Sequence, residues 1–244
     1  MINKIQRRNY VMIKKLTVLM LGVLMILSMV ACGNTATDTE TDHQANSKTA
    51  ETTASTEKAE DSIHSEQTEG GSKMLVAYFS LAGEQYGVGV IEEGNTSIIA
   101  HMIAEQTGAD LFEIKAVNPY PTSHSELLEV SRKEMSDKAR PEIADTVDNM
   151  DEYDTVFIGY PNWWGDMPMI VYNFLESYNL SGKTIVPFCT HGGSGLSGTE
   201  RTIKNITDGT MADGFAIAGT TAQNDRDTAK SKVTEWLREG GFVE

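Results

Sequence analysis

The sequence has few cysteines, few cationic side chains and no apolar run long enough to cross a membrane. Its 244 residues include 2 Cys, and its 20 Lys and Arg are outnumbered by 35 Asp and Glu, which gives a formal net charge of −15. Two cysteines exclude a disulfide-rich scaffold. The negative charge argues against binding to nucleic acid and against attraction to anionic lipid headgroups. The longest apolar run, residues 16–30, is shorter than the about 20 residues that a membrane-spanning helix needs.

The N-terminal residues instead have the tripartite pattern of a secretory signal. A cationic stretch, residues 1–15, precedes the apolar run, and Cys32 follows it closely. The end of this segment resembles a bacterial lipobox, with Met29 where that pattern prefers Leu. The resemblance implies a signal peptide over residues 1–31 and a lipid on the sulfur of Cys32, which would anchor the protein to the membrane outside the cytoplasm. A plain signal peptide with an incidental cysteine is the alternative, and Met12 is an alternative start.

Residues 32–72 are expected to form a disordered tether between this anchor and a folded domain. They are rich in Thr, Ser, Glu and Ala, they contain Ile63 as a single bulky aliphatic residue, and they have no aromatic residue. Such a composition buries too little apolar surface to offset the entropy of ordering. With Cys32 assigned to lipidation, Cys189 has no disulfide partner, so the domain is expected to be stabilised by its core.

Residues 73–244 alternate between short apolar runs and amphipathic stretches. Apolar runs bounded by Gly, Pro or polar residues predict strands, and apolar residues at three- and four-residue spacing predict helices. The expected strands are residues 74–80, 111–117, 154–161, 183–192 and 215–220, and the expected helices begin at Thr96 or cover residues 123–135, 168–178, 197–206 and 226–240, with a Gly-rich loop at 81–94. This alternation predicts one α/β domain of three layers, a parallel sheet with helices on both faces.

Three of the predicted strands are followed by loops that suit a ligand. Ligands of open α/β sheets bind beyond the carboxyl ends of the strands, so these loops are expected to share one edge. The first contains Ser80 and ends in residues 94–97 at a helix start, which is either an ordinary cap or a seat for an anion. The second places Trp163 and Trp164 side by side, and the third, residues 189–198, is rich in Gly. Together they predict a pocket for a phosphorylated planar heterocycle.

The stretches YFS…GNT, IGYPNWWGDMP and FCTHGGSG, which carry these loops, resemble the flavodoxin family, in particular its flavodoxin 4 branch. The resemblance covers nearly all of residues 73–244. It implies a flavodoxin-like fold with a five-stranded parallel sheet in the order 2-1-3-4-5, and FMN bound without a covalent bond. One departure is an insertion at residues 83–94, which interrupts the family's phosphate loop and could add backbone contacts or a lid.

The resemblance also implies roles for individual residues of this chain. The phosphate would be held by the side chains of Ser80, Asn95 and Thr96 and by backbone N–H groups of Gly94 and Ser97. One side of the flavin ring would be lined by Pro161, Asn162, Trp163, Trp164, Gly165 and Asp166, and the other side by Thr190, His191, Gly192 and Gly193.

Two functions of different kinds follow from this pocket. No residue stands out as a general acid, base or nucleophile, no nicotinamide site is evident, and the histidines lack the spacing of metal ligands. The first hypothesis is therefore an electron carrier or a small FMN-dependent oxidoreductase, with redox partner proteins that the sequence does not identify. The second is a membrane-anchored module that holds flavin as a scavenger or sensor without redox turnover.

Overall fold

The computed structural model describes residues 72–244. The predicted signal peptide, the predicted lipidation site at Cys32 and the predicted tether up to residue 71 lie outside the described residues. Within residues 72–244, no helix has both the length and the apolar character that a membrane crossing requires.

The centre of the domain is a parallel sheet. Its strands are β1 (Met74–Tyr78), β4 (Asp110–Glu113), β5 (Thr155–Pro161), β6 (Thr184–His191), β7 (Thr210–Met211) and β8 (Phe215–Ala218). The order is β4-β1-β5-β6-β7, β8 also pairs with β6, and all of these pairs are parallel. This arrangement confirms the predicted order 2-1-3-4-5. The fifth position differs in being shared by two short strands, β7 beside the start of β6 and β8 beside its end.

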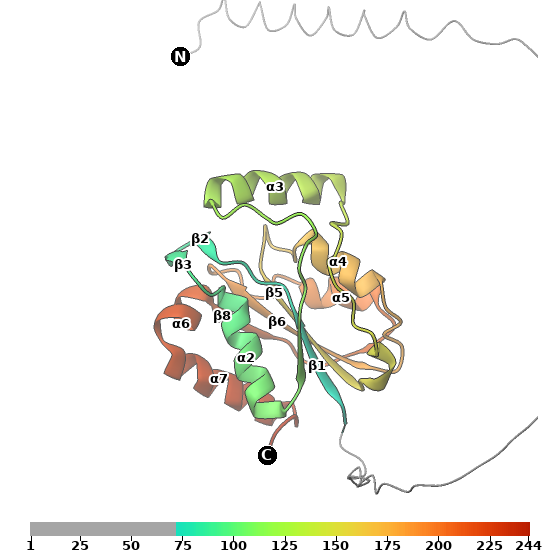
Figure 1. Ribbon diagram of the computed structural model, residues 1–244. Coiled ribbons are helices and arrows are strands. Elements are labelled where there is room, and N and C mark those ends of the chain that lie inside the picture. Colours follow the sequence, from blue (N-terminus) through green and yellow to red (C-terminus); the bar gives the residue numbers. More distant parts are fainter. Residues whose placement is uncertain (1–71) are drawn as a thin grey trace, which may run out of the picture. The chain divides into compact units, whose positions relative to one another are not determined.

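Helices cover both faces of the sheet (Figure 1). One face carries α2 (Asn95–Thr107), α6 (Gly219–Asn224) and α7 (Arg226–Glu239), and the other carries α4 (Met169–Glu176) and α5 (Thr199–Ile206). The two faces form separate apolar clusters because alternate strand residues point to opposite sides. Val76 and Phe157 pack with α2 and α7, while Leu75 and Ile158 pack with α4.

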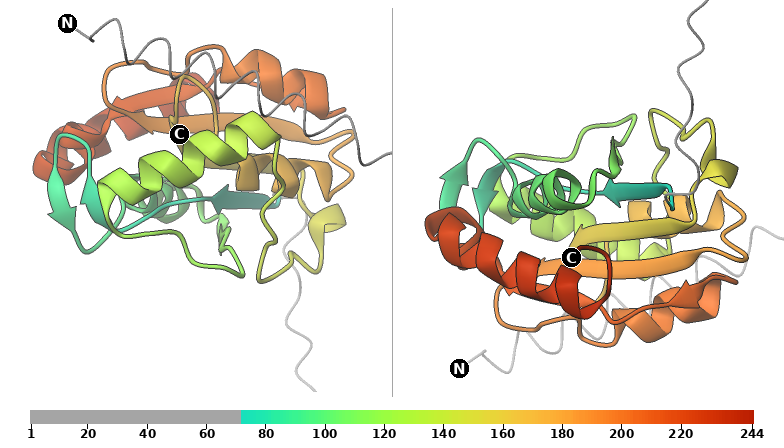
Figure 2. Two further views of the ribbon diagram at one scale, coloured as in Figure 1. Left: turned by 90° about the horizontal axis from the view of Figure 1, so that it is seen from above. Right: turned by 90° about the horizontal axis from the view of Figure 1, so that it is seen from below.

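Helix α3 (His124–Asp137) is attached to the domain in a different way. It lies across the edge at which the sheet strands end, as the views from above and from the side show (Figures 1 and 2). Only Leu127 and Ser131 of this helix are buried. Because so little of α3 is buried, its position depends on a few specific contacts. Farther along the chain, the short 3-10 helix η1 (Met150–Glu152) precedes β5.

The segment between β1 and α2 is a β-hairpin, which corrects the predicted loop at residues 81–94. Strands β2 (Gly83–Gln85) and β3 (Gly89–Ile91) pair antiparallel. Each strand has three residues, too few for an alternating pattern to be recognised in the sequence. Gly83 has a φ of +94° and lies so close to Thr122 that a Cβ atom would be 2.6 Å from the Thr122 carbonyl oxygen, so the hairpin is seated against the segment before α3.

Candidate functional site

A cavity of about 670 Å³ lies at the edge where the strands end. Its walls come from the hairpin, the start of α2, α3 and the loops after β5, β6 and β8; the lining residues are Gln85, Tyr86, Asn95, His124, Leu127, Leu128, Ser131, Pro161, Asn162, Trp163, Trp164, Gly165, Thr190, His191, Gly192, Gly193, Ser194 and Gly219. Its volume is within the range of small-molecule sites, about 300–1,000 Å³.

The cavity brings together ten of the fifteen predicted site residues, from all three loops. They are Asn95, Pro161, Asn162, Trp163, Trp164, Gly165, Thr190, His191, Gly192 and Gly193. The other five, Ser80, Gly94, Thr96, Ser97 and Asp166, are not among the lining residues. The convergence of the loops is therefore as predicted, and the contacts of those five residues with FMN stay predictions.

Hydroxyl groups at the start of α2 hold the loops together. The Ser80 hydroxyl oxygen accepts the backbone N–H of Ser97 at 3.0 Å, so it occupies one of the unpaired N–H groups of the first helical turn. The Thr96 and Thr190 hydroxyls are 2.8 Å apart and buried, which joins the first loop to the third. Gly94 fits beneath them, because a Cβ atom there would lie 2.2 Å from the Ser80 hydroxyl oxygen. These contacts join the start of α2 to the first and third loops beside the cavity.

Asn95 is the residue at the start of α2 that faces the cavity. Its Oδ1 atom is buried and has no hydrogen-bond partner among residues 72–244. A buried acceptor without a donor is costly unless a ligand supplies one, which the hydroxyl groups of a ribityl chain can do. The first turn of α2 contains no acidic side chain, and helix starts favour anions. The residues present therefore fit a ligand with hydroxyl groups and a phosphate.

The loop after β5 is closed by a tight turn from Trp163 to Asp166. The two residues exchange backbone hydrogen bonds of 2.8 and 2.9 Å, and the central residues have positive φ angles, +58° at Trp164 and +82° at Gly165. Positive φ at both central positions defines a type I′ turn. The Gly165 N–H also donates to the Asn162 side-chain oxygen at 3.0 Å, so the turn is fixed from within.

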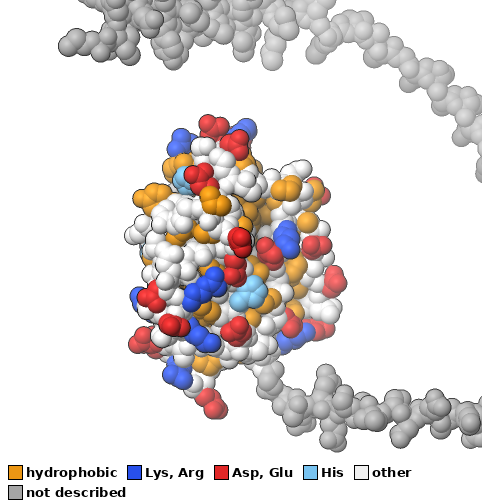
Figure 3. All heavy atoms as spheres, turned by 60° about the vertical axis from the view of Figure 1, so that its left-hand side comes forward, with side chains coloured by type: hydrophobic (Ala, Val, Ile, Leu, Met, Phe, Trp, Pro, Cys, Tyr) orange, Lys and Arg blue, Asp and Glu red, His pale blue; other side chains and the backbone are white. Residues whose placement is uncertain are grey.

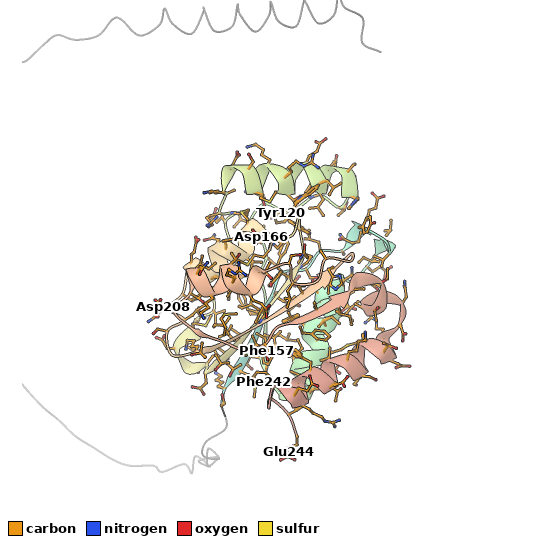
Figure 4. The ribbon with its side chains drawn as sticks, turned by 180° about the vertical axis from the view of Figure 1, so that it is seen from behind. Tyr120, Phe157, Asp166, Asp208, Phe242 and Glu244 are labelled. Atoms are coloured by element: carbon orange, nitrogen blue, oxygen red, sulfur yellow. The ribbon has the colours of Figure 1, made fainter. Side chains whose placement is uncertain are left out.

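The two adjacent indoles have different surroundings. Trp163 packs edge-on against Phe79 and Tyr120, with ring centroids 5.5 and 5.7 Å away, and Figure 4 shows Tyr120 directly beneath α3. Trp163 therefore packs with core residues as well as lining the cavity. Trp164 is 44% exposed, and its Nε1–H donates to the Ser131 hydroxyl oxygen at 3.0 Å.

Asp166 acts inside the protein and does not face the cavity. Its carboxylate accepts the Met167 backbone N–H and the Tyr172 hydroxyl, both at 2.8 Å. Burial, together with the neighbouring Asp166 carboxylate, raises the pKa of Tyr172, so this hydroxyl stays protonated and remains a donor. Asp166 therefore ties the end of the turn to α4.

The loop after β6 forms another wall of the cavity. The Gly193 N–H donates to His191 Nδ1 at 2.9 Å, which places the proton of the neutral imidazole on Nε2. Burial lowers the pKa of His191, so the ring is neutral at pH 7. Gly192 lies against Tyr86, because a Cβ atom there would be 2.9 Å from the tyrosine ring. The hairpin therefore packs against this wall.

Several lining residues were not predicted from the sequence. They are Gln85 and Tyr86 of the hairpin, His124, Leu127, Leu128 and Ser131 of α3, and Ser194 and Gly219. Ser194 belongs to the Gly-rich loop and could have been included on that ground. The α3 residues carry no comparable signal, because a helix after the second strand is expected to cover a face of the sheet.

The described residues contain no group of three His, Cys, Asp or Glu side chains that could hold a metal ion. On the face drawn in Figure 3, acidic and basic side chains are intermingled rather than gathered into a basic patch.

A parallel sheet with helices on both faces and a cavity beyond its strand ends defines a doubly wound α/β protein with a ligand site at the usual edge. Comparison with known families is more specific. The family model described as Flavodoxin, of the flavodoxin 4 type, matches residues 73–239. The chain belongs to the flavodoxin family, as its sequence resemblance implied.

Two solved structures from Bacteroides agree with this assignment. A candidate flavoprotein from Bacteroides eggerthii DSM 20697 is 31% identical, with 70% of this chain and 99% of that chain covered and a TM-score of 0.55. A candidate flavoprotein from Bacteroides uniformis ATCC 8492 is 30% identical, covers 69% and 99% of the two chains and has a TM-score of 0.54. A flavoprotein in complex with FMN from Lactobacillus acidophilus NCFM is 19% identical, with 68% and 99% covered and a TM-score of 0.49. No curated protein matches the chain.

Proposed function

We propose that the domain binds FMN in this cavity without a covalent bond and acts in electron transfer. The observation that carries the proposal is the convergence of the α2 start, the Trp163–Asp166 turn and the Gly-rich loop after β6 on one cavity. Membership in the flavodoxin family supports the same cofactor. FMN would supply the redox chemistry, since it can accept and release electrons, and the protein would supply binding, orientation and electrostatics.

The residues of the chain divide into groups that suit the parts of FMN. The first turn of α2 would hold the phosphate, because it offers backbone N–H groups and no acidic side chain, and the unpaired Asn95 Oδ1 would accept a ribityl hydroxyl. Trp163 and Trp164 would cover one side of the ring, and residues 190–193 the other. The strong negative charge of the chain would disfavour an anionic reduced cofactor and so lower the reduction potential.

The N-terminal sequence supports an extracytoplasmic location. In this proposal a lipid on Cys32 anchors the protein to the outer side of the cytoplasmic membrane, and residues 33–72 let the domain reach partners at that surface. The redox partners would be proteins or small molecules of the same compartment. Whether turnover involves a protein partner alone or a small substrate distinguishes an electron carrier from a small oxidoreductase.

A membrane-anchored flavin scavenger or sensor is the second candidate, and the position of α3 favours it. Leu127, Leu128 and Ser131 of this helix close one side of the cavity, which would slow release of a bound flavin and would also separate it from large partners. A module that retains flavin needs such a cover more than an electron carrier does.

Titration of the purified mature chain with FMN tests the cofactor. Stacking on indoles should quench FMN fluorescence and shift its visible absorption bands, and the absence of both changes would remove the proposal. Photoreduction of the loaded protein then separates the two functions. An electron carrier should retain the reduced flavin and reoxidise without loss. A scavenger or sensor needs to retain only the oxidised flavin, so it should release the flavin on reduction or fail to cycle.

A further inference from the structure

Trp164 has a backbone conformation that its own side chain disfavours. A φ of +58° is in the left-handed region, which glycine adopts freely and which is an outlier for a bulky aromatic residue. Such a conformation persists only where the surroundings hold it in place. Trp164 is also 44% exposed, so close packing on all sides does not hold it.

Two consecutive residues of α3 make the contacts that hold the Trp164 side chain. The indole Nε1–H donates to the Ser131 hydroxyl oxygen at 3.0 Å, and the Arg132 guanidinium carbon lies 4.4 Å from the centre of the indole ring. That distance is typical of a cation–π interaction. Ser131 is 5% exposed, and its own hydroxyl proton points to the Leu128 carbonyl oxygen at 3.3 Å. The Ser131 oxygen is therefore oriented to accept a hydrogen bond from the indole.

Helix α3 is fixed at other points, so it can serve as a support. The His124 backbone N–H donates to the Glu84 carboxylate of the hairpin at 3.1 Å. Farther along α3, the Glu134 carboxylate accepts the Tyr120 hydroxyl at 3.0 Å, and Tyr120 packs against Trp163. Both indoles are thereby connected to one helix, Trp164 directly and Trp163 through Tyr120.

The Trp163–Asp166 turn also fixes the neighbouring loop after β6. The Asn162 side chain accepts the Gly165 N–H, and its amide group donates to the Gly195 carbonyl oxygen at 2.8 Å and to the Ser197 hydroxyl at 3.1 Å. If Trp164 relaxed to a negative φ, the type I′ turn could not persist and the Gly165 N–H would leave Asn162. The ring wall after β5 and the loop after β6 would then move together.

We propose that Ser131 and Arg132 are positioning residues, which hold Trp164 and its turn in the geometry that the flavin ring meets. The inference rests on the proposed function. Its consequence is that two α3 side chains outside the family's flavin-binding loops set the affinity and the reduction potential of the bound flavin.

The test uses the mature chain and the variants Ser131→Ala and Arg132→Gln. Ser131→Thr, which keeps the hydroxyl, is the conservative replacement, and Ser125→Ala, at the exposed first turn of α3, is the matched control. Near-UV circular dichroism of the FMN-free proteins, with Trp164→Phe as a reference, reports the indole environment. FMN titration and redox potentiometry report the two flavin properties.

Ser131→Ala and Arg132→Gln should each weaken FMN binding about three- to tenfold, as expected for one lost hydrogen bond or one lost cation–π contact. Both should change the reduction potential and the near-UV signal, while Ser131→Thr and Ser125→Ala should resemble the wild type. The inference is overturned if Ser131→Ala and Arg132→Gln match Ser125→Ala in affinity, potential and near-UV signal. Failure of the wild-type chain to bind FMN would overturn the proposed function instead, and the near-UV comparison would still report the Trp164–Ser131 contact.

Discussion

Trp164 adopts a left-handed backbone conformation that glycine would adopt without strain. The strain belongs to the backbone, whereas the contacts with Ser131 and Arg132 belong to the side chain. Substitutions that remove the indole and differ only at Cβ separate these contributions.

Trp164→Gly and Trp164→Ala both delete the indole, so we expect both to lose the contact with α3. We expect Trp164→Gly to be more stable than Trp164→Ala by about 1 kcal/mol, because Ala keeps the Cβ that opposes a positive φ. Urea unfolding of the two variants measures the difference. At positions with negative φ the order is the reverse, so greater stability of the Ala variant would show that the turn has changed its conformation.

The substitution Asn95→Asp tests whether the start of α2 binds an anion, because Asp and Asn have nearly the same shape. Asn95→Asp adds a negative charge at the start of α2, where it stabilises the helix but repels a phosphate. We expect FMN affinity to fall at least tenfold and riboflavin affinity to change much less, in parallel fluorescence titrations. Asn179→Asp, which adds the same charge before β6 at the opposite edge of the sheet, should leave both affinities near those of the wild type. An equal loss of FMN and riboflavin affinity would place the phosphate elsewhere.

At the residue scale, the sequence predicted which residue types gather at the cavity better than it predicted what each does there. Asn95 and Trp163 reach the cavity as expected. Ser80 and Thr96 do not, because their hydroxyls meet partners far along the chain, Ser97 and Thr190. A sequence motif contains the hydroxyl but not the neighbour that determines its direction.

At the scale of elements, α3 is the unusual part of this domain. Its range was predicted within two residues, since residues 123–135 were expected and His124–Asp137 are helical. Its place over the cavity was not predicted, because its few apolar residues do not specify which surface it covers. The hairpin was missed for a related reason, as strands of three residues give no periodic signal.

The Glu134 carboxyl of α3 gives this helix a pH dependence that can be measured. Burial raises the pKa of Glu134 above its ordinary value of 4.5, and the hydrogen bond from Tyr120 opposes this only in part. A carboxyl with a raised pKa contributes stability that is fully present below the ordinary pKa and is lost as the pH rises through the folded-state pKa. The partial burial of the Glu134 carboxyl therefore costs more stability at a pH above its folded-state pKa than at a pH below it.

Glu134→Gln removes that charge and keeps an oxygen that can accept the Tyr120 hydroxyl. We expect the variant to be more stable than the wild type at pH 7 and the advantage to disappear toward pH 4, as measured by urea unfolding across this range. Glu129→Gln, on the exposed side of α3, serves as the control and should show a smaller change with pH. An advantage that grows on acidification would contradict the assigned direction of the pKa.

At the scale of the whole molecule, the convergence of the loops was predictable from the alternation of strands and helices, whereas the strand order 2-1-3-4-5 was implied by the family resemblance. Parallel strands end at one edge, so the loops after β1, β5 and β6 had to converge once the alternation of strands and helices was recognised. The division of the fifth strand position was not predictable, because β7 has two residues, Thr210 and Met211, and one of these is polar.

The predicted anchor concerns the whole molecule as well. Cys32→Ser removes the sulfur that would carry the lipid, so we expect the protein to move from the membrane fraction to the soluble extracytoplasmic fraction. Immunoblotting of cell fractions measures the change, and mass spectrometry of the wild-type protein should find a lipid-modified Cys32. If wild type and variant are both soluble, the N-terminal segment is a plain signal peptide.

The Ser80–Ser97 and Thr96–Thr190 hydrogen bonds have a consequence for how this site can vary in evolution. They fix both ends of the segment between β1 and α2. The hairpin within this segment can therefore become longer, become shorter or be replaced while the start of α2 stays in place. Proteins of this fold can therefore vary the hairpin at the entrance of the cavity without changing the start of α2, where the ligand would bind.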